Sequence, residues 1–258
     1  MQALKLPARR GWLWLAAGFA IFRKNPPLLT FLVISYWMLA ATMNLIPLIG
    51  AIIATVCIPA FSVSLMNACR ELDQGRPIAP LLLFSGFREN LRALLILGGL
   101  YLGATVGILA ISSLLDDGLL MQMMLAGTRP GEEALTSEPF LAATRLALIL
   151  LVPLMMAYWY APALAAWHGF TAGKALFFSF YACLRNWRAF IAYAAAIVVF
   201  GALLPGAVLG LLAVLIPESV NLVATLFSVP MLLILAPTLF ASFYASYRDV
   251  FVAVDENA

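Results

Sequence analysis

Five long stretches of the sequence contain no Asp, Glu, Lys or Arg. They are residues 25–69, 93–115, 146–173, 189–217 and 219–247. Because one transmembrane helix needs about 20 consecutive apolar residues, each of the last four stretches is long enough for one helix. The first stretch has 45 residues, which predicts two helices separated by a turn at Asn44, Pro47 and Gly50. This pattern restricts the chain to helices that cross a membrane.

The composition indicates the same fold class. Of the 258 residues, 64% are hydrophobic and 10% are charged, and the mean hydropathy is +1.01. Soluble domains have about 25% charged residues, so a soluble or disordered protein is excluded. We expect an all-α polytopic membrane protein with one transmembrane domain over residues 1–258. The six predicted transmembrane helices are 27–44, 48–68, 93–114, 146–166, 189–214 and 220–245.

The basic residues predict the orientation of these helices. Thirteen of the fifteen Lys and Arg residues lie on one side of them, and only Arg129 and Arg145 lie on the other. Basic residues concentrate on the cytoplasmic side, so we expect a bacterial inner-membrane protein with both termini in the cytoplasm. Residues 1–22 resemble a signal peptide, but Arg23 and Lys24 follow directly and we expect no cleavage. The net charge of +3 is too small for nucleic-acid binding.

The sequence contains three related segments. Residues 90–95 (NLRALL) resemble residues 186–191 (NWRAFI), and residues 25–29 (NPPLL) resemble both more loosely. In each copy the asparagine follows a basic residue and an apolar segment of about ten residues, which is too short to cross a membrane. We expect these segments to be elbow helices, meaning short amphipathic helices that lie in the cytoplasmic interface. The elbow segments are 11–22, 78–87 and 175–184.

The related segments also predict the architecture. Each copy consists of an elbow helix, a basic corner with an asparagine, an outward helix and a return helix that contains proline. Three copies with the same orientation form three parallel hairpin repeats. The repeats cover about 11–70, 75–170 and 173–250, and the second has an outer insertion at about 116–144.

Each elbow segment ends in a corner, where a basic residue stands close to an asparagine. The corners are Arg23 with Asn25, Arg88 with Asn90, and Arg185 with Asn186. Asparagine is a good N-cap, and a cation beside it anchors the helix among lipid phosphates. The alternative is a specific lipid-headgroup site, because a helix N-terminus adds N–H donors and partial positive charge. Membrane phospholipids are the expected partners in both interpretations.

Three prolines stand at related positions in the predicted return helices. They are Pro59, Pro162 and Pro237. Proline inside a helix produces a kink and frees a carbonyl group, which a neighbouring helix can satisfy. The kinks either outline a central cavity or only shape the packing of the helices.

Glycines at a spacing of four residues occur in the third predicted helix. They are Gly99, Gly103 and Gly107. Small residues at this spacing allow two membrane helices to approach closely. The partner is either another helix of this chain or a second protein, and the sequence does not distinguish them.

Several short motifs resemble a known family. They are GWLW at 11–14, FRKNP at 22–26, YAPAL at 160–164, AL at 175–176 and ACLRNW at 182–187. Together they resemble a family of uncharacterised bacterial six-helix inner-membrane proteins and, more distantly, the membrane domains fused to some glycerophosphodiester phosphodiesterases. The likeness covers nearly the whole chain and implies the six-helix fold. It implies no activity, because that family has none assigned and this chain lacks a phosphodiesterase domain.

Charged side chains are missing from the predicted transmembrane helices. None of the six contains Asp, Glu, Lys or Arg, which argues against a proton-coupled pump or a voltage sensor. His168 is the single histidine, and we interpret the acidic residues of 116–144 as an exposed loop. Cys57, Cys69 and Cys183 have no paired spacing and are expected to be reduced. We therefore expect no enzyme, no cofactor and no metal site.

Two functions follow from these features. One is a non-catalytic scaffold or accessory subunit that binds other integral membrane proteins or a second copy of itself through a glycine-rich face. The alternative is a lipid- or amphiphile-handling protein, such as a flippase or a lipid-binding module, because of the elbows and basic corners. A channel or another transporter is the third hypothesis. It requires a polar cavity lined by Ser64, Asn67, Thr238 and Ser242.

Overall fold

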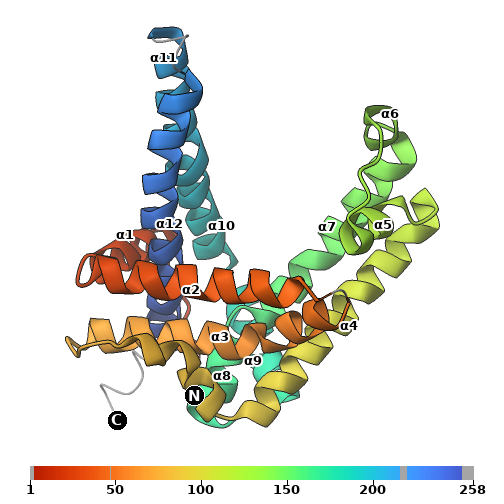
Figure 1. The fold of residues 1–258 in the computed structure, drawn as a ribbon. Helices are drawn as coiled ribbons and strands as arrows, with labels where there is room; N and C mark the ends of the chain where they lie inside the picture. Colours follow the sequence, from red (N-terminus) through yellow and green to blue (C-terminus); the bar gives the residue numbers. More distant parts are fainter. Residues whose placement is uncertain (1–2, 47, 216–219, 252–258) are drawn as a thin grey trace. The chain divides into compact units, whose positions relative to one another are not determined.

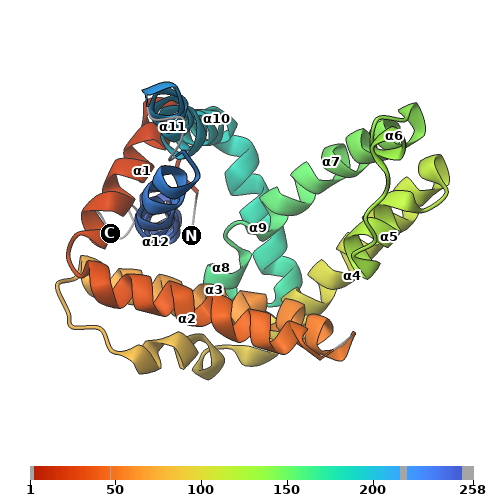
Figure 2. The ribbon, with the colours of Figure 1, turned by 45° about the horizontal axis from the view of Figure 1, so that its top comes forward.

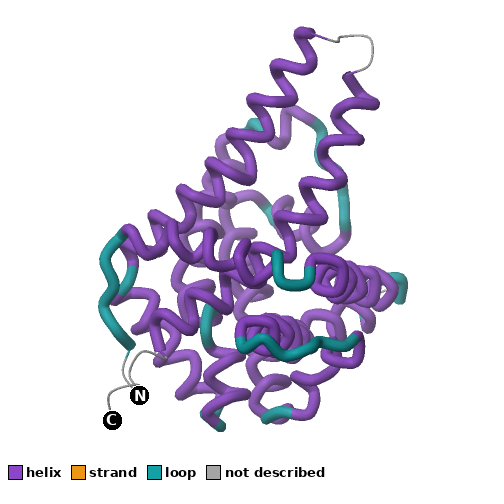
Figure 3. The backbone as a smooth tube through the Cα atoms, turned by 90° about the vertical axis from the view of Figure 1, so that its left-hand side faces the viewer, coloured by secondary structure: helices purple, strands orange, loops and turns teal. Residues whose placement is uncertain are grey.

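The structure is a computed structural model that describes residues 3–46, 48–215 and 220–251. Figure 1 labels its elements, and the described residues form helices, turns and loops with no strand among them, as Figure 3 also shows. Pro47, at the predicted turn, lies outside the described residues. The elements are α1 (Arg9–Phe22), α2 (Pro26–Asn44), α3 (Ile49–Asp73), η1 (Pro80–Arg88), α4 (Leu91–Asp116), α5 (Leu119–Ala126), α6 (Glu132–Leu135), α7 (Glu138–Tyr158), α8 (Ala161–His168), α9 (Ala172–Arg185), α10 (Trp187–Val198), η2 (Val199–Leu203), α11 (Leu204–Leu215) and α12 (Val220–Phe251).

The prediction of six apolar helices is confirmed. Six helical segments are long and apolar enough to cross a membrane. Two of them are composite, because α7 and α8 together form one segment and α10, η2 and α11 together form another. The six segments are Pro26–Asn44, Ile49–Asp73, Leu91–Asp116, Glu138–His168, Trp187–Leu215 and Ala224–Phe251.

Separate short helices occupy the three predicted elbow segments. They are α1, η1 and α9. The second is a 3-10 helix, not an α-helix, and the N–H of Gly86 inside it donates to the Ser64 hydroxyl at 2.8 Å. That bond anchors η1 to α3. In an α-helix the same N–H would donate to a backbone carbonyl of its own helix. The position of the elbows in a membrane interface stays a prediction.

The chain forms two compact units that interleave along the sequence. Unit 1 consists of residues 1–42, 60–89 and 182–258, and unit 2 consists of residues 43–59 and 90–181, apart from the residues outside the described ranges. The unit boundaries do not coincide with those of the three predicted repeats. The repeat therefore stays a prediction, and each unit is described by itself.

Unit 1 is organised around α1. Figure 2 shows α1 beside α12 and α10, and these helices pack against one another. Trp14 is 2% exposed, and Ile21 and Phe22 are also buried on the same face of α1. On its other face, Trp12 and Phe19 are exposed. The helix thus has one buried apolar face and further apolar side chains that its neighbours leave exposed.

Unit 2 is organised around the pair α4 and α7, which lie side by side in Figure 1. A small core of Leu109, Leu120, Phe140 and Ala143 joins these two helices to α5. Asp116 ends α4 and accepts from the N–H of Leu120 at 2.7 Å. The carboxylate thus stabilises the start of α5, because negative charge and an acceptor are favourable at a helix N-terminus.

Candidate functional site

The glycines of α1 bring this helix into backbone contact with two neighbours. A Cβ atom built on Gly11 would lie 1.9 Å from the carbonyl oxygen of Ala189 in α10. A Cβ built on Gly18 would lie 2.5 Å from the backbone nitrogen of Ser242 in α12. Such contacts require glycine, because any side chain would displace the opposing backbone. Gly11 and Gly18 therefore determine how closely α1 packs against α10 and α12 in unit 1.

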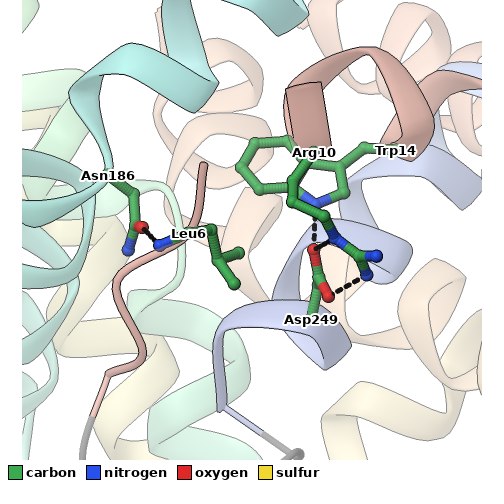
Figure 4. A network of polar contacts seen from close by, with 5 residues as sticks. All are labelled: Leu6, Arg10, Trp14, Asn186 and Asp249. Carbon is green, nitrogen blue, oxygen red and sulfur yellow. Dashed lines mark hydrogen bonds and ion pairs between the residues drawn. The ribbon is translucent and has the colours of Figure 1, made fainter. Parts of the chain in front are cut away.

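A carboxylate near the end of α12 fastens α1 by side-chain bonds. Asp249 accepts from Arg10 Nε and from Trp14 Nε1, each at 2.8 Å, and Arg10 Nη2 also pairs with it (Figure 4). The hydrogen bond to Asp249 raises the pKa of Arg10, although partial burial opposes the rise. The bond to Trp14 satisfies the single donor of a buried indole. The sequence did not predict this network, because Arg10 and Asp249 are 239 positions apart and no local pattern connects them.

Asn186 holds the segment that precedes α1. The residue is 1% exposed, and its Oδ1 accepts from the N–H of Leu6 at 2.8 Å (Figure 4). Its Nδ2 donates to the carbonyl oxygens of Leu4 at 2.8 Å and Ala182 at 3.0 Å. In the described structure, the Asn186 side chain makes no capping bond to α10, so the capping prediction is wrong for Asn186. Its amide instead satisfies a neighbouring backbone segment.

The other two corner asparagines differ from each other. Asn25 is a true N-cap, because its Oδ1 accepts from the N–H of Leu28 at 3.3 Å. Asn90 makes no capping bond to α4 in the described structure. Its Nδ2 donates to the carbonyl oxygens of Ala165 at 3.1 Å and Phe170 at 3.3 Å. Capping is thus confirmed at Asn25 and wrong at Asn90, where the amide binds one carbonyl in the second half of α8 and one just after that helix ends.

The start of α2 offers no free N–H group to an anion. Pro26 and Pro27 have no amide hydrogen. The N–H of Leu28 is used by the Asn25 side chain, and the N–H of Leu29 donates to the Asn25 carbonyl at 3.2 Å. A phosphate at this corner would therefore have to bind to side chains and not to the helix end.

The three corner arginines keep their charges available. Arg23, Arg88 and Arg185 are exposed, and among the described residues none of them is paired with a carboxylate. The neighbouring Lys24 differs, because its Nζ lies 3.8 Å from Asp73 Oδ1 and donates to the Asp73 carbonyl at 2.8 Å. Asp73 also pairs with Arg248. Asp73 and Asp249 thus neutralise cations around α1 and leave Arg23 uncompensated.

An apolar pocket lies between α1, η2 and α12 in unit 1. We call it the α1 pocket, and its volume is about 410 Å³, within the size range of small-ligand sites. Its walls are apolar except for Thr238, whose hydroxyl donates to the Ile234 carbonyl at 2.7 Å. Its lining residues are Trp12, Leu15, Ala16, Phe19, Phe200, Met231, Ile234, Leu235 and Thr238.

A local change of helix geometry forms one wall of this pocket. Residues Val199–Leu203 form one turn of π-helix between α10 and α11. Phe200 lies in that turn, and its ring centroid is 5.1 Å from that of Trp12. π-helical turns are rare and frequently occur at functional sites. No pattern in the sequence predicts this turn.

Pro237 lies inside α12 and Pro59 inside α3, as predicted for two of the three prolines. Proline at position 237 frees the carbonyl of Leu233, four residues earlier. The Thr30 hydroxyl of α2 donates to that carbonyl at 3.1 Å. A neighbouring helix therefore satisfies the freed group, which is the arrangement the sequence predicted.

Pro162 is not a kink inside a continuous helix. It stands in the first turn of α8, and the helical segment breaks between Tyr158 and Ala161. The Ser179 hydroxyl of α9 enters this break, where it accepts from the N–H of Tyr160 at 2.8 Å and donates to the Met156 carbonyl at 2.9 Å. A hydroxyl inserted between an N–H and the carbonyl four residues earlier is a known cause of helix breaks.

The glycines of α4 have mixed surroundings within unit 2. A Cβ on Gly98 would lie 2.1 Å from the Val56 carbonyl oxygen, so this glycine allows close packing on α3. For Gly99, Gly103 and Gly107, no atom of the described residues lies within 4 Å of such a Cβ. Among the described residues of unit 2, no helix therefore packs against the predicted motif.

The described residues include no group of three or more His, Cys, Asp and Glu side chains that could hold a metal ion. The four polar residues of the predicted transport cavity make bonds within unit 1. The Ser64 hydroxyl donates to the Ala60 carbonyl, Asn67 donates to Ser85 Oγ, and Ser242 Oγ bonds to the Tyr193 hydroxyl at 2.6 Å. Their polar atoms are used by bonds within one helix or between neighbouring elements of unit 1.

The sequence has a full-length curated relative. The chain is 35% identical over 264 residues to a protein named "Probable inner membrane protein BTH_II0599" from Burkholderia thailandensis. The match covers 100% of this chain and 97% of the relative. No protein-family model matches the chain, and no solved structure matches it. With the six apolar helices, this similarity supports a multi-pass location in the inner membrane. The chain belongs to the family of this probable inner membrane protein.

Proposed function

We propose that the protein binds a membrane amphiphile, with an acyl chain of the ligand in the α1 pocket. The observation that supports this function is the pocket itself. The pocket has a nearly apolar wall and a volume suited to a small ligand. It borders helices that would be surrounded by lipid. Hydrocarbon is the ligand chemistry that such a wall favours, because the hydroxyl of its one polar residue, Thr238, is already bonded within α12.

The elbow topology complements this proposal. With both termini in the cytoplasm and α1 in the cytoplasmic interface, the α1 pocket would open just below the lipid headgroups. Trp12 and Phe19 are exposed on the pocket side of α1, as expected for an interfacial helix. Binding or handling a lipid requires no covalent chemistry, which agrees with transmembrane helices that contain no catalytic set.

Transport through a polar centre is less well supported. Ser64, Asn67, Thr238 and Ser242 are at most 4% exposed, and each makes a side-chain bond within unit 1. Polar groups already satisfied by protein neighbours have little need for a water-filled path.

Filling the pocket tests the proposed function. Ala16 lines the pocket, whereas Ala20 is an exposed alanine on the same helix that does not line it. The protein would be reconstituted with a phospholipid that carries a photoreactive group on its acyl chain, and crosslinked peptides would be quantified by mass spectrometry. We expect Ala16→Phe to reduce crosslinks to α1 and α12 by about tenfold, equivalent to about 1.4 kcal/mol of binding. Ala20→Phe should leave them unchanged, and equal crosslinking in both variants would contradict the proposal.

A scaffold or accessory subunit is the second candidate function. The observation that favours it is the open surface at Gly99, Gly103 and Gly107, where no described atom lies within 4 Å of a built Cβ. Such a surface could seat a helix from a second membrane protein. Crosslinking from cysteines placed beside Gly103, in membranes, measures whether a protein or only lipid covers it.

A further inference from the structure

Arg23 places a positive charge next to one wall of the α1 pocket, although it does not line the pocket itself. Phe19 lines the pocket, and the guanidinium carbon of Arg23 lies 5.5 Å from the centroid of the Phe19 ring. The two residues are four positions apart on the same face of the helical chain. The cation therefore sits beside the wall of the pocket and is held there by the ring.

Arg23 differs from three other cations of unit 1, each of which is paired with a carboxylate. Arg10 is bound to Asp249, and both Lys24 and Arg248 are bound to Asp73. In the part of the chain that the structure describes, no carboxylate pairs with Arg23. Arg23 therefore offers an available positive charge beside a residue that lines the pocket, and this charge favours an anionic group on the occupant.

The shape of the pocket fits an extended chain. Its residues on α12 are Met231, Ile234, Leu235 and Thr238, which follow one face of the helix over two turns, or about 10 Å. Met231 and Leu235 offer flexible or branched apolar surface, which adapts to a hydrocarbon chain. A compact polar ligand would leave most of this wall without a partner.

From these observations we infer that the occupant is an anionic phospholipid whose phosphate binds Arg23 while one acyl chain fills the α1 pocket. This inference rests on the proposed function. A guanidinium suits this role because its planar donors bind two phosphate oxygens at once. The side chain must supply these donors, because Pro26 and Pro27 remove N–H groups from the start of α2.

The test measures lipid selectivity and pocket occupancy separately. The full chain would be placed in nanodiscs that contain equal amounts of phosphatidylglycerol and phosphatidylethanolamine, then released for native mass spectrometry. We expect the retained lipid to be enriched in phosphatidylglycerol, and Arg23→Gln to lower that enrichment about fivefold, as for the loss of one basic contact. Arg23→Lys should retain part of the enrichment.

Arg188→Gln is the matched control. Arg188 is also exposed and also lies over an aromatic ring, with its guanidinium carbon 5.3 Å from the Trp187 ring centroid, but neither residue lines the pocket. The enrichment should survive in this variant. An equal fall in enrichment in both variants would overturn the inference, because it would show that lipid selection depends on general surface charge. Preferential retention of phosphatidylethanolamine or of free fatty acid would also overturn it.

Failure of the inference is distinguishable from failure of the proposed function. If Ala16→Phe removes acyl-chain crosslinks but Arg23→Gln leaves the lipid ratio unchanged, the pocket binds lipid without headgroup selection and the inference is wrong. If Ala16→Phe leaves the crosslinks unchanged, the proposed function itself fails. Thermal unfolding of each variant shows whether it is folded, and Arg23→Lys supplies a second variant if Arg23→Gln is not.

Discussion

The glycines of α1 and those of α4 belong to similar apolar helices but have opposite surroundings. In unit 1, Gly11 and Gly18 touch the backbones of α10 and α12. In unit 2, Gly103 has no described atom near the position of a Cβ. Glycine spacing thus indicates where close packing is allowed, and only the structure shows where it occurs. The same substitution should therefore have opposite effects in the two units.

The short helices α1 and α9 are also attached to their neighbours by different chemistry. In unit 1, α1 lies against α12 through Gly18, which leaves no space at the contact. In unit 2, α9 is attached to the broken segment α7–α8 through the Ser179 hydroxyl. A backbone contact tolerates no added atom, whereas a hydroxyl bridge loses only its hydrogen bonds when it is removed. We therefore expect substitutions at the backbone contact to reduce the stability of the protein more than removal of the hydroxyl bridge.

The largest effect is expected for Gly18→Ala. The added Cβ would lie 2.5 Å from the backbone nitrogen of Ser242, so α1 and α12 must separate, at a cost of about 3 kcal/mol. Unfolding in mild detergent, followed by tryptophan fluorescence, measures the change. A variant as stable as the parent would show that α1 is not seated on α12 as described.

Removal of the carboxylate that fastens α1 should have the next largest effect. Asp249→Ala leaves the half-exposed Arg10 and the buried indole N–H of Trp14 without their acceptor. We expect a loss of about 2 kcal/mol of stability, since the ion pair with Arg10 is partly screened by solvent while the Trp14 indole is buried. Asp249→Asn keeps an acceptor oxygen and should recover part of the loss. Equal stability of Asp249→Ala and the parent would exclude a fastening role.

A smaller effect is expected for the hydroxyl bridge of unit 2. Ser179→Ala leaves the Tyr160 N–H and the Met156 carbonyl without the hydroxyl that joins them. The expected loss is about 1 kcal/mol, as for other side-chain hydrogen bonds in membrane proteins. The exposed Ser113, which bonds only to the Ala110 carbonyl of its own helix, is the control. If Ser113→Ala costs as much, the bridge has no special role.

The smallest effect, and one of opposite sign, is expected for Gly103→Ala. With no described atom near the new Cβ, the variant gains helix propensity and should be more stable by up to about 1 kcal/mol. A clear loss of stability at high protein concentration, absent on dilution, would instead reveal a second protein seated on α4. That result would support the scaffold function and would show that the glycines of α4 are also contacts, contrary to the difference between the two units described above.

The sequence predicted local features well and long-range partners poorly. The six apolar helices, the three short helices before the corners and the cap at Asn25 follow from neighbouring residues alone. The roles of Asn90 and Asn186 do not, because an asparagine in the same motif can cap a helix or bind a backbone brought near by the fold. Asp249 is likewise 239 positions from Arg10, and no local pattern connects them.

The candidate site shows the same division. The sequence identified Arg23 as a cation at a corner, but it could not show that Lys24 is paired and Arg23 is not. It predicted a short helix over 11–22, which contains Trp12 and Phe19, but not the π-helical turn that brings Phe200 against Trp12. The pocket wall combines side chains from three separate parts of the chain, so it exists only once they are folded together.

The sequence by itself determined that this chain is a multi-pass helical membrane protein, because its long uncharged stretches have no other stable environment. Tertiary structure alone decided which glycines are contacts, which cations are neutralised and where a pocket remains. Hydropathy is a property of each residue and can be summed along the chain. Packing and ion pairing depend on distances between residues far apart in sequence, and these distances are set only when the helices come together.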